Sequence, residues 1–301
     1  MRHLPLLAIG GLLMNALVWG TAWWPFRFLQ SNGLHSLWAT VFIYAVACAL
    51  IAGFKREAFS QIVARPHLLW IALGSGITNA TFNWGVTIGE VVRIVLLFYL
   101  MPIWSALLAR WLLGEAITPL TVGRIALALA GAALVLSKAG AGFPLPSSLA
   151  DFLGIAGGAS FALNNVLLRK YAADPAPARA LAMFAGGMLL AGLLASTLTA
   201  VGSIAAPTHA TASAWWGAAA LAAWFIVGNL ALQYGASRLA ASTTAIIMLS
   251  EIIFASASAV WLGNEALSGR VLLGGALIMA AAALAALPQS AITQSKKDTS
   301  P

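Results

Sequence analysis

Two pairs of amide side chains lie inside apolar stretches of the chain and repeat at a fixed interval. Asn79 and Asn83 are four residues apart, and Asn229 and Gln233 have the same spacing 150 positions later. Residues four apart share one face of a helix, so each pair places two amides side by side. Amides in hydrocarbon need partners, which are either a neighbouring helix or a polar solute. The doubled pair therefore indicates interhelical packing or the wall of a binding site.

Glu251 is the one acidic residue that lies deep in an apolar stretch. An isolated carboxylate in hydrocarbon is expected to be protonated or paired. Three roles are open to it: it carries a coupling proton, it binds an ammonium group, or it is a neutral structural hydrogen bonder. Glu115 and Glu265 lie at the ends of apolar stretches, where capping or closing the following turn is the simpler role.

Further candidates for a substrate site are aromatic or amide side chains within the apolar stretches. An aromatic belt at the membrane surface explains most of the 12 tryptophans. Deeper rings either pack in the core or stack on an aromatic solute. The candidates are Trp19, Tyr99, Trp104, Phe161, Asn164, Asn165 and Tyr234.

The sequence contains no arrangement typical of an enzyme or a metal site. It has no His-Glu-x-x-His, no Gly-x-Ser-x-Gly and no paired aspartates within an apolar stretch. The 4 histidines lie at the N-terminus or near the ends of apolar stretches, and Cys48 is the only cysteine. We therefore expect no catalytic residue, no metal and no cofactor.

Composition identifies the elements that must position these residues. The chain is 61% hydrophobic and 8% charged, with a mean hydropathy of +0.92, whereas a soluble domain carries about 25% charged residues. It is therefore expected to be an all-α integral membrane protein. The net charge of +8 comes from basic residues that flank apolar runs and form no patch, so nucleic acid is not an expected partner.

Ten apolar runs are long enough to cross a bilayer, which requires about 20 residues. They cover roughly 5–28, 34–54, 67–87, 91–111, 119–138, 150–170, 178–200, 213–236, 241–263 and 268–287. If the N-terminus is cytoplasmic, 12 of the 16 Lys and Arg residues lie on the cytoplasmic side. The positive-inside rule then predicts that both termini are cytoplasmic.

The sequence repeats itself at an interval of 150 residues. "WLLGEA" at 111–116 matches "WLGNEA" at 261–266, and Arg27 aligns with Arg169 at an interval of 142. The repeat predicts two five-helix units, at 1–140 and 141–288, followed by a cytoplasmic tail at 289–301. Five is an odd number, so the second unit must be inverted in the membrane, with Glu115 and Glu265 at opposite faces.

Inverted repeats are a recurrent device of secondary transporters, because two related units can exchange conformations and expose a central site to alternate sides. Duplication without such exchange, as in a channel, stays open. Pro102 lies in the middle of the fourth apolar run, where it removes a backbone hydrogen bond and kinks the helix. We expect it to act as a hinge that is stronger in the first unit, because Ile252 has the matching place in the second.

Two stretches resemble the signature of EamA-type members of the drug/metabolite transporter superfamily. In that pattern an acidic residue and a proline precede an apolar run that closes in Leu-Gly-Glu. "LMPIWSALLARWLLGEAIT" (100–118) keeps Pro102 with Met101 in place of the acid, and "LSEIIFASASAVWLGNEAL" (249–267) keeps Glu251 with Ile252 in place of the proline. The resemblance covers essentially the whole chain. Within the superfamily, "NATFNWGV" (79–86) is most similar to YddG-type exporters of aromatic amino acids.

The resemblance implies a multi-pass protein of the bacterial inner membrane that exports a small molecule from the cytoplasm. No Lys or Arg is expected at the middle of a span, which disfavours phosphorylated substrates and nucleotide sugars. Amide and aromatic groups suit a zwitterion with a large apolar side chain, so aromatic and other apolar amino acids are the expected substrates. The alternative is export of cationic or amphipathic drugs or metabolites, coupled to protons through Glu251. The lipid bilayer is the other expected partner, and the chain is expected to be a monomer.

Overall fold

The computed structural model describes residues 3–114, 116–136, 145–171, 173–236, 247–248 and 250–286. Within these residues the chain is helical apart from turns and short connections, and it contains no strand. The helices are α1 (His3–Thr21), α2 (Trp23–Ser31), α3 (Ser36–Phe54), α4 (Glu57–Val63), α5 (Leu68–Ile88), α6 (Val91–Phe98), α7 (Met101–Leu113), α8 (Pro119–Leu136), α9 (Leu149–Lys170), α10 (Ala176–Ala200), the short 3-10 helix η1 (Pro207–His209), α11 (Ala212–Ala236), α13 (Ser250–Gly263) and α14 (Gly269–Ala286).

The helices confirm an all-α protein that crosses a membrane several times. Over the described residues, 6 helical segments are long and apolar enough to span a bilayer, and 3 further apolar helices are shorter. Most helix ends lie within a few residues of the ends of the predicted spans. The full count of ten spans and the side on which the termini lie stay predictions.

The first predicted span, at about 5–28, is divided into two helices. α1 and α2 are separated by a turn at Ala22. Pro25 accounts for the break, because proline has no N–H to donate to the carbonyl of Thr21, four residues earlier. The chain therefore changes direction before it enters α2, whose side chains lie at one end of the bundle.

The fourth predicted span is also divided, by a turn at 99–100 between α6 and α7. Pro102 lies in the first turn of α7, where a proline is tolerated. Pro102 has no N–H to donate to the Phe98 carbonyl. That carbonyl lies against Gly158 of α9, and a side chain at position 158 would collide with it. The helix break at this place is observed, whereas a hinge function for Pro102 stays a prediction.

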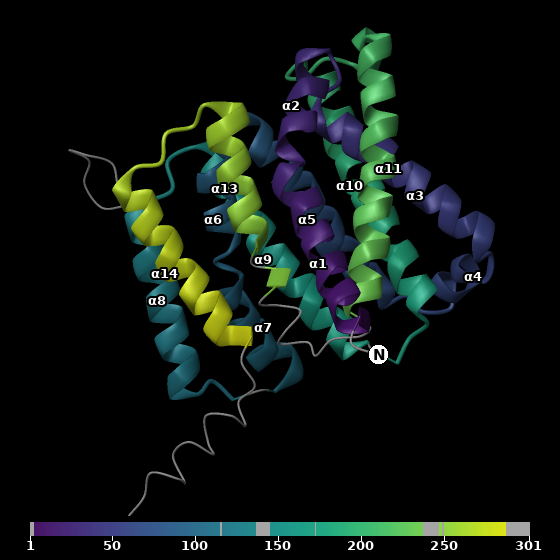
Figure 1. The fold of residues 1–301 in the computed structure, drawn as a ribbon. Coiled ribbons are helices and arrows are strands. Elements are labelled where there is room, and N and C mark those ends of the chain that lie inside the picture. The colour runs from purple at the N-terminus through teal and green to yellow at the C-terminus, as the bar shows by residue number, and fades with distance from the viewer. Residues whose placement is uncertain are drawn as a thin grey trace, which may run out of the picture.

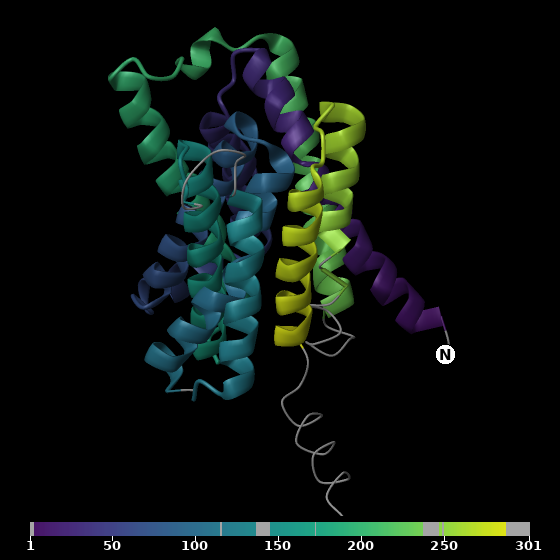
Figure 2. The same ribbon diagram turned by 90° about the vertical axis from the view of Figure 1, so that its left-hand side faces the viewer.

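Contacts between the first and second halves of the chain organise the bundle (Figure 1, Figure 2). α5 packs against α9 and α10, α1 packs against α11 and α13, and α9 also packs against α6 and α7. α3 packs against α10 and α11, and α8 and α14 lie side by side along one flank. The approach of α8 to α14 depends on glycine, because an added Cβ on Gly131 would lie 2.6 Å from the carbonyl oxygen of Gly274.

The bundle has two ends that are named here by the short helices lying there (Figure 1). The α2 end holds α2, the C-terminal ends of α5 and α13 and the N-terminal ends of α6 and α11. The α4 end holds α4, the C-terminal ends of α7 and α9 and the N-terminal ends of α8 and α10. Arg27 lies at the α2 end, and Asp174 lies at the α4 end.

At the α2 end, a neutral linkage joins the loop after α2 to the start of α11. The backbone N–H of Thr211 donates to the Asn32 carbonyl at 3.1 Å, and the hydroxyl of Ser213 donates to Asn32 Oδ1 at 3.1 Å. Nearby, His35 Nδ1 accepts the N–H of Leu37 at 3.2 Å and caps α3. Burial lowers the pKa of His35 to about 4, so this imidazole is neutral at physiological pH.

At the α4 end, a charged linkage joins the loop before α5 to the loop before α10. Asp174 lies 3.2 Å from Arg65 Nε and 2.6 Å from His67 Nε2. The hydrogen bond with His67, together with the Arg65 guanidinium, lowers the pKa of Asp174 below its ordinary value. Asn32 and Asp174 are 142 positions apart, the interval that relates the first predicted span to the sixth.

The two repeated sequences, at 111–116 and 261–266, end their helices in the same way. α7 is followed by Gly114 with φ 71°, and α13 is followed by Asn264 with φ 52°. Both residues are left-handed, a conformation that glycine adopts without strain and asparagine tolerates better than other residues. The acid that comes next is Glu265 in the second sequence, whereas Glu115 in the first sequence lies outside the described residues.

Candidate functional site

A row of aromatic rings crosses the middle of the bundle. Each ring lies within 6.4 Å of the next, centroid to centroid, and the closest pair is 4.6 Å apart. The row runs through Phe26, Phe225, Trp19, Phe82, Phe98 and Phe161, which come from α2, α11, α1, α5, α6 and α9. Trp19 and Phe161 are partly exposed, whereas the other rings are buried. The row offers aromatic faces to an apolar group.

The row leads to a polar pair at the break of the fourth span. Tyr99 follows Phe98, its ring centroid 6.0 Å from that of Phe98, and its hydroxyl donates to Glu251 Oε2 at 3.2 Å. Tyr99 is 6% exposed, while Glu251 keeps partial exposure in the first turn of α13. The structure therefore brings Tyr99, Glu251, Trp19 and Phe161 into one neighbourhood, while a substrate site there stays a prediction.

Several polar atoms around this cluster have no hydrogen-bond partner among the described residues. They are the indole nitrogen of Trp104 in α7, the hydroxyl of Ser250 at the start of α13, and the amide oxygen of Asn15 in α1. The amide nitrogen of Asn15 reaches Met248 Sδ at 3.6 Å. Buried polar groups are normally paired, so these atoms are available to a bound polar molecule or to water.

Asn79 and Asn83 point away from the aromatic row, toward α3. Asn79 accepts a hydrogen bond from the Tyr44 hydroxyl and donates to the Ser75 carbonyl at 2.8 Å. Asn83 donates to Thr40 Oγ1 at 2.9 Å, and its amide oxygen has no partner among the described residues. The first pair of amides therefore joins α5 to α3, which is the interhelical packing that the sequence left open.

The remaining amide candidates are dispersed. Asn164 is buried against Gly74 of α5, and its amide oxygen has no partner among the described residues. Asn165 is exposed, with its nearest polar contact at 3.9 Å from Met101 Sδ. The other candidates lie on α11: Asn229, Tyr234 and Gln233, whose side chain is outside the described residues.

A second group of polar side chains fastens helix ends at the α2 end. Arg93 binds Asp151 with two hydrogen bonds, Nε to Oδ1 at 2.6 Å and Nη2 to Oδ2 at 3.0 Å. Arg93 Nη1 also donates to the Val135 carbonyl at 2.6 Å, and Asp151 accepts the backbone N–H of Ser147 at 3.0 Å. The ion pair thus joins α6, the end of α8 and the start of α9. The sequence analysis gave Arg93 no partner.

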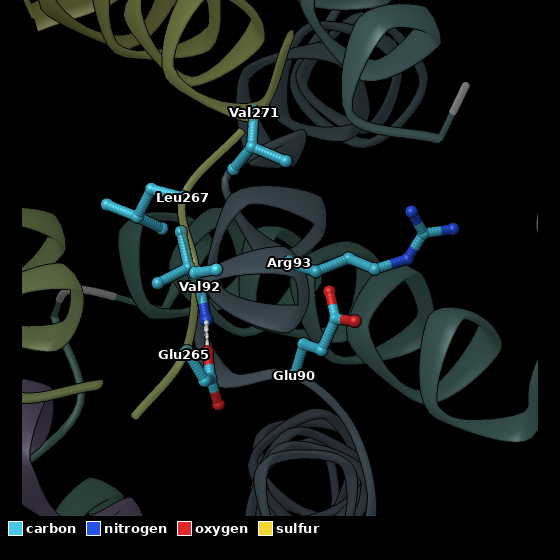
Figure 3. A pocket seen from close by; sticks show the side chains of 7 residues that line it. Glu90, Val92, Arg93, Glu265, Leu267 and Val271 are labelled. Atoms are coloured by element: carbon cyan, nitrogen blue, oxygen red, sulfur yellow. Dashed lines mark hydrogen bonds between the residues drawn. The ribbon is translucent and has the colours of Figure 1, made fainter. Parts of the chain in front are cut away.

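A small pocket opens beside the start of α6, and Figure 3 shows six of its lining side chains with labels. The lining residues are Glu90, Val92, Arg93, Glu265, Ala266, Leu267 and Val271. Arg93 is engaged by Asp151, and Glu265 accepts the backbone N–H of Val92 at 3.4 Å. Most of the polar groups of this pocket therefore hold helix ends, so we assign the pocket no substrate.

Sequence reasoning missed four rings of the aromatic row: Phe26, Phe82, Phe98 and Phe225. The chain has 13 phenylalanines, and spacing alone does not separate a ring that faces the middle of the bundle from one that faces lipid. Phe82 precedes Asn83, and Phe98 precedes the break at Tyr99, so proximity to these polar positions was the available signal.

Comparison with known proteins gives the same class of protein. Residues 6–137 match the model of the EamA-like transporter family. A protein of Streptantibioticus cattleyicolor named "Probable terminal-alkyne amino-acid exporter" is 30% identical over 277 residues, which cover 90% of each chain. A solved structure titled "Crystal structure of protein" is similar in fold, with a TM-score of 0.59, 19% sequence identity and coverage of 97% of this chain and 98% of the other.

Proposed function

The chain belongs to the EamA-like transporter family, and on that premise we propose that it exports aromatic and other apolar amino acids across the bacterial inner membrane. The observation that carries this proposal is the aromatic row that ends at the pair of Tyr99 and Glu251. The rings would receive an apolar side chain, and the carboxylate would receive an ammonium group. The relative from Streptantibioticus cattleyicolor, whose name specifies amino-acid export, supports the same substrate class.

The carboxylate of the amino acid would lie at the start of α7. α7 begins inside the bundle at the break of the fourth span, so its helix dipole favours an anion there. The indole N–H of Trp104, one turn into α7, is buried and has no partner among the described residues, so it can donate to the same anion. A zwitterion would thus bridge the start of α7 and the carboxylate of Glu251 on α13.

We further propose that the chain is a secondary transporter with two inverted five-helix units, at 1–140 and 141–288. The helix contacts support this symmetry. If α1 corresponds to α9, α5 to α11, and α6 with α7 to α13, exchanging the units converts the contact of α1 with α11 into that of α9 with α5. It also converts the contact of α1 with α13 into those of α9 with α6 and α7. Both termini then lie in the cytoplasm, with the α2 end outside.

One alternative function retains the same central site. Among the described residues, Glu251 is the only carboxylate linked to the aromatic row. The link is its hydrogen bond with Tyr99, whose ring lies next to that of Phe98. A single carboxylate beside aromatic rings also suits a cationic or amphipathic drug or metabolite, with a proton as the exchanged ion. The two functions differ in their dependence on a pH gradient and on the substrate's carboxylate.

Flux through purified protein in liposomes tests the proposal. Vesicles loaded with labelled phenylalanine or tryptophan should show saturable efflux and counterflow, more slowly for leucine and negligibly for glycine. A terminal-alkyne amino acid and an aromatic amine without a carboxylate complete the panel, each measured with and without a pH gradient. Glu251→Gln should lower kcat/KM by roughly tenfold or more, which is about 1.4 kcal/mol of lost transition-state binding.

Two matched controls separate the site from general damage. Glu90→Gln removes an exposed acid outside the aromatic row, and Trp261→Phe alters a ring that is 84% exposed. Both should keep flux within about twofold. Phe161→Ala should raise KM for tryptophan more than for leucine, because a stacking surface is lost. Efflux of the amine but of no amino acid would replace the proposed function with the alternative.

A further inference from the structure

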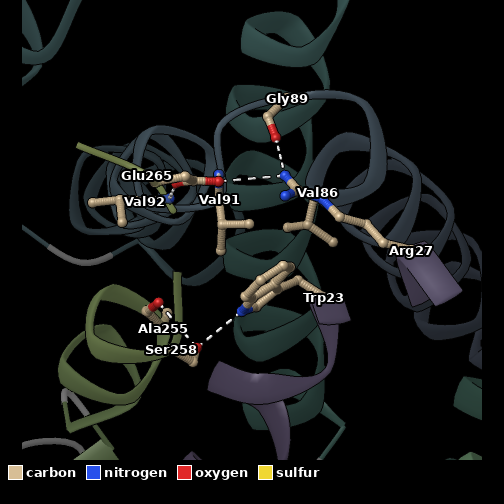
Figure 4. A network of polar contacts seen from close by, with 9 residues as sticks. All are labelled: Trp23, Arg27, Val86, Gly89, Val91, Val92, Ala255, Ser258 and Glu265. Carbon is tan, nitrogen blue, oxygen red and sulfur yellow. Dashed lines mark hydrogen bonds and ion pairs between the residues drawn. The ribbon is translucent and has the colours of Figure 1, made fainter. Parts of the chain in front are cut away.

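A polar network at the α2 end joins the two halves of the chain (Figure 4). Arg27 of α2 donates from Nη2 to the Gly89 carbonyl at 2.6 Å and to Glu265 Oε1 at 3.4 Å. Glu265 accepts the backbone N–H of Val91 at 2.9 Å and that of Val92 at 3.4 Å. Glu265 therefore caps α6 from the loop that follows α13.

An aromatic side chain fills the space beneath this ion pair. Trp23 is 3% exposed, and its indole N–H donates to Ser258 Oγ of α13 at 2.9 Å. The Arg27 guanidinium lies over the Trp23 ring at 4.8 Å. Gly263 borders the same ring, since an added Cβ there would lie 3.0 Å from it. Trp23 follows Trp19 by four residues and packs in the same hydrophobic cluster, so it joins that part of the aromatic row to the ion pair.

Two of the corresponding positions at the α4 end are described and are less buried, whereas Glu115 and the side chain of Arg169 lie outside the described residues. By the intervals of 142 and 150 residues, Trp23 corresponds to Asn165 and Ser258 to Leu108. Asn165 is exposed and Leu108 is partly exposed, whereas Trp23 and Ser258 are buried. Ala259, fully buried at the α2 end, has a partly exposed counterpart in Ala109. The structure is therefore closed around Trp23 and more open around the equivalent residues.

We infer that Trp23, Arg27, Ser258 and Glu265 close the central site on the α2 side, and that transport requires this closure to open. The inference rests on the proposed transport function, in which the central site is exposed to alternate sides of the membrane. It assigns the closing of one side to these four positioning residues. Among the described residues, no hydrogen bond or ion pair joins any of the four to Glu251 or Tyr99, so they act through the helices that they join. On this inference, a molecule would enter the central site from the α4 side.

Side-specific labelling tests the closure without using any substrate. In a Cys48→Ala background, Ser250→Cys reports on the middle of the bundle, and Ser203→Cys in the exposed turn after α10 identifies the α2 side. A membrane-impermeant thiol reagent should label Ser250→Cys only from the α4 side. Adding Arg27→Ala or Glu265→Gln should raise labelling from the α2 side by roughly tenfold and lower it from the α4 side.

Conservative variants and a matched control complete this experiment. Arg27→Lys keeps a donor and should return part of the wild-type protection, while Trp261→Phe in the neighbouring exposed position should change nothing. Unchanged labelling from the α2 side in Arg27→Ala, Glu265→Gln and Trp23→Ala would overturn the inference. If labelling responds as expected but no amino acid is transported, the closure stands and the proposed substrate fails.

A cross-link provides a second test that does not depend on weakened packing. Arg27→Cys with Glu265→Cys, bridged by a short bifunctional thiol reagent, should hold the α2 side closed. Flux of the substrate should stop on bridging and return on reduction to the level of the unbridged double variant. Full flux through the bridged protein would show that these positions need not separate, which contradicts the inference.

Discussion

At the α2 end, Arg93 and Asp151 form a doubly hydrogen-bonded pair in which the Asp151 side chain is 1% exposed. At the α4 end, Asp174 is paired with Arg65 and His67, whose side chains are 34% and 36% exposed. Both sets of contacts join the first half of the chain to the second. Water and salt screen the exposed set, whereas they have little access to the buried pair.

The contacts between the two halves also differ in whether they are formed at both ends of the bundle or at the α2 end. The loop linkages of Asn32 and of Asp174 are formed at both ends in the same structure. Contacts present at both ends at once are compatible with a fixed support. The network of Arg27 and Glu265 lies beside Trp23, which is buried while its described counterpart Asn165 is exposed, and a gate requires such a difference between the ends.

The largest effect is expected from the buried pair. Arg93→Met should lower the free energy of unfolding by roughly 3–5 kcal/mol, because Asp151 keeps its backbone donors but loses its counter-charge in a buried position. Asp174→Ala should cost far less, since that carboxylate is screened by solvent. Thermal or denaturant unfolding in detergent measures both variants.

A double-mutant cycle isolates the pair from the cap that Asp151 also provides to α9. Arg93→Met with Asp151→Asn leaves no buried charge and keeps an acceptor for the backbone, so it should recover part of the loss. If Arg93→Met were no more destabilising than Asp174→Ala, burial would not distinguish the two ends.

A smaller effect is expected at the ends of the repeated sequences. Gly114→Ala should cost about 1–2 kcal/mol, because φ of 71° is strained for alanine. Nothing lies within 4 Å of a Cβ added there, so crowding contributes nothing. Asn264→Gly is the matched change at φ 52° and should be neutral or stabilising by a few tenths of a kcal/mol. Equal costs for the two variants would contradict the shared left-handed ending.

The two acids of the repeated sequences should bias the transporter in opposite directions. Glu265→Gln weakens the closure at the α2 end, and the repeat predicts that Glu115→Gln weakens the corresponding contact with Arg169 at the α4 end. Labelling of Ser250→Cys from the α2 side should therefore rise by roughly tenfold in the first variant, whereas labelling from the α4 side should rise in the second. If labelling shifted toward the same side of the membrane in both variants, the predicted equivalence of the two ends would be wrong.

Sequence alone predicted the helices well, because long apolar runs bounded by polar residues leave few alternatives in a membrane. Pro25 could have predicted the break between α1 and α2, since a proline inside a span frees the carbonyl four residues earlier. The repeated sequences predicted a common device at the ends of α7 and α13. Its physical basis, the left-handed backbone at Gly114 and Asn264, became clear only from the dihedral angles.

The candidate site was predicted less completely, because spacing identifies a helix face but not the helix opposite that face. Asn79 and Asn83 do share a face of α5, which meets α3 rather than the aromatic row. Arg93 and Asp151 are 58 positions apart, and no local pattern links them. Tyr99 and Glu251 could be predicted as members of a site because polar groups deep in a span are few.

The smallest expected effect is a difference in how the two loop linkages, those of Asp174 and Asn32, respond to pH. The pKa of Asp174 is lowered, so its linkage stabilises the folded state above the ordinary carboxylate pKa of about 4 and is lost as the pH falls through the lowered value. Asp174→Asn should therefore melt about 1–2 °C below the wild type near pH 6, and the difference should shrink steadily as the pH falls below about 4.

Asn32→Ala is the matched change at the α2 end, where Asn32, Thr211 and Ser213 carry no titrating group. Its difference from the wild type should be the same across this pH range. His35 titrates nearby with a pKa of about 4, but it is retained in both proteins and its contribution cancels to first order. If the Asn32 difference also shrank in acid, the loss at Asp174 would reflect general acid unfolding rather than the charge that distinguishes the two ends.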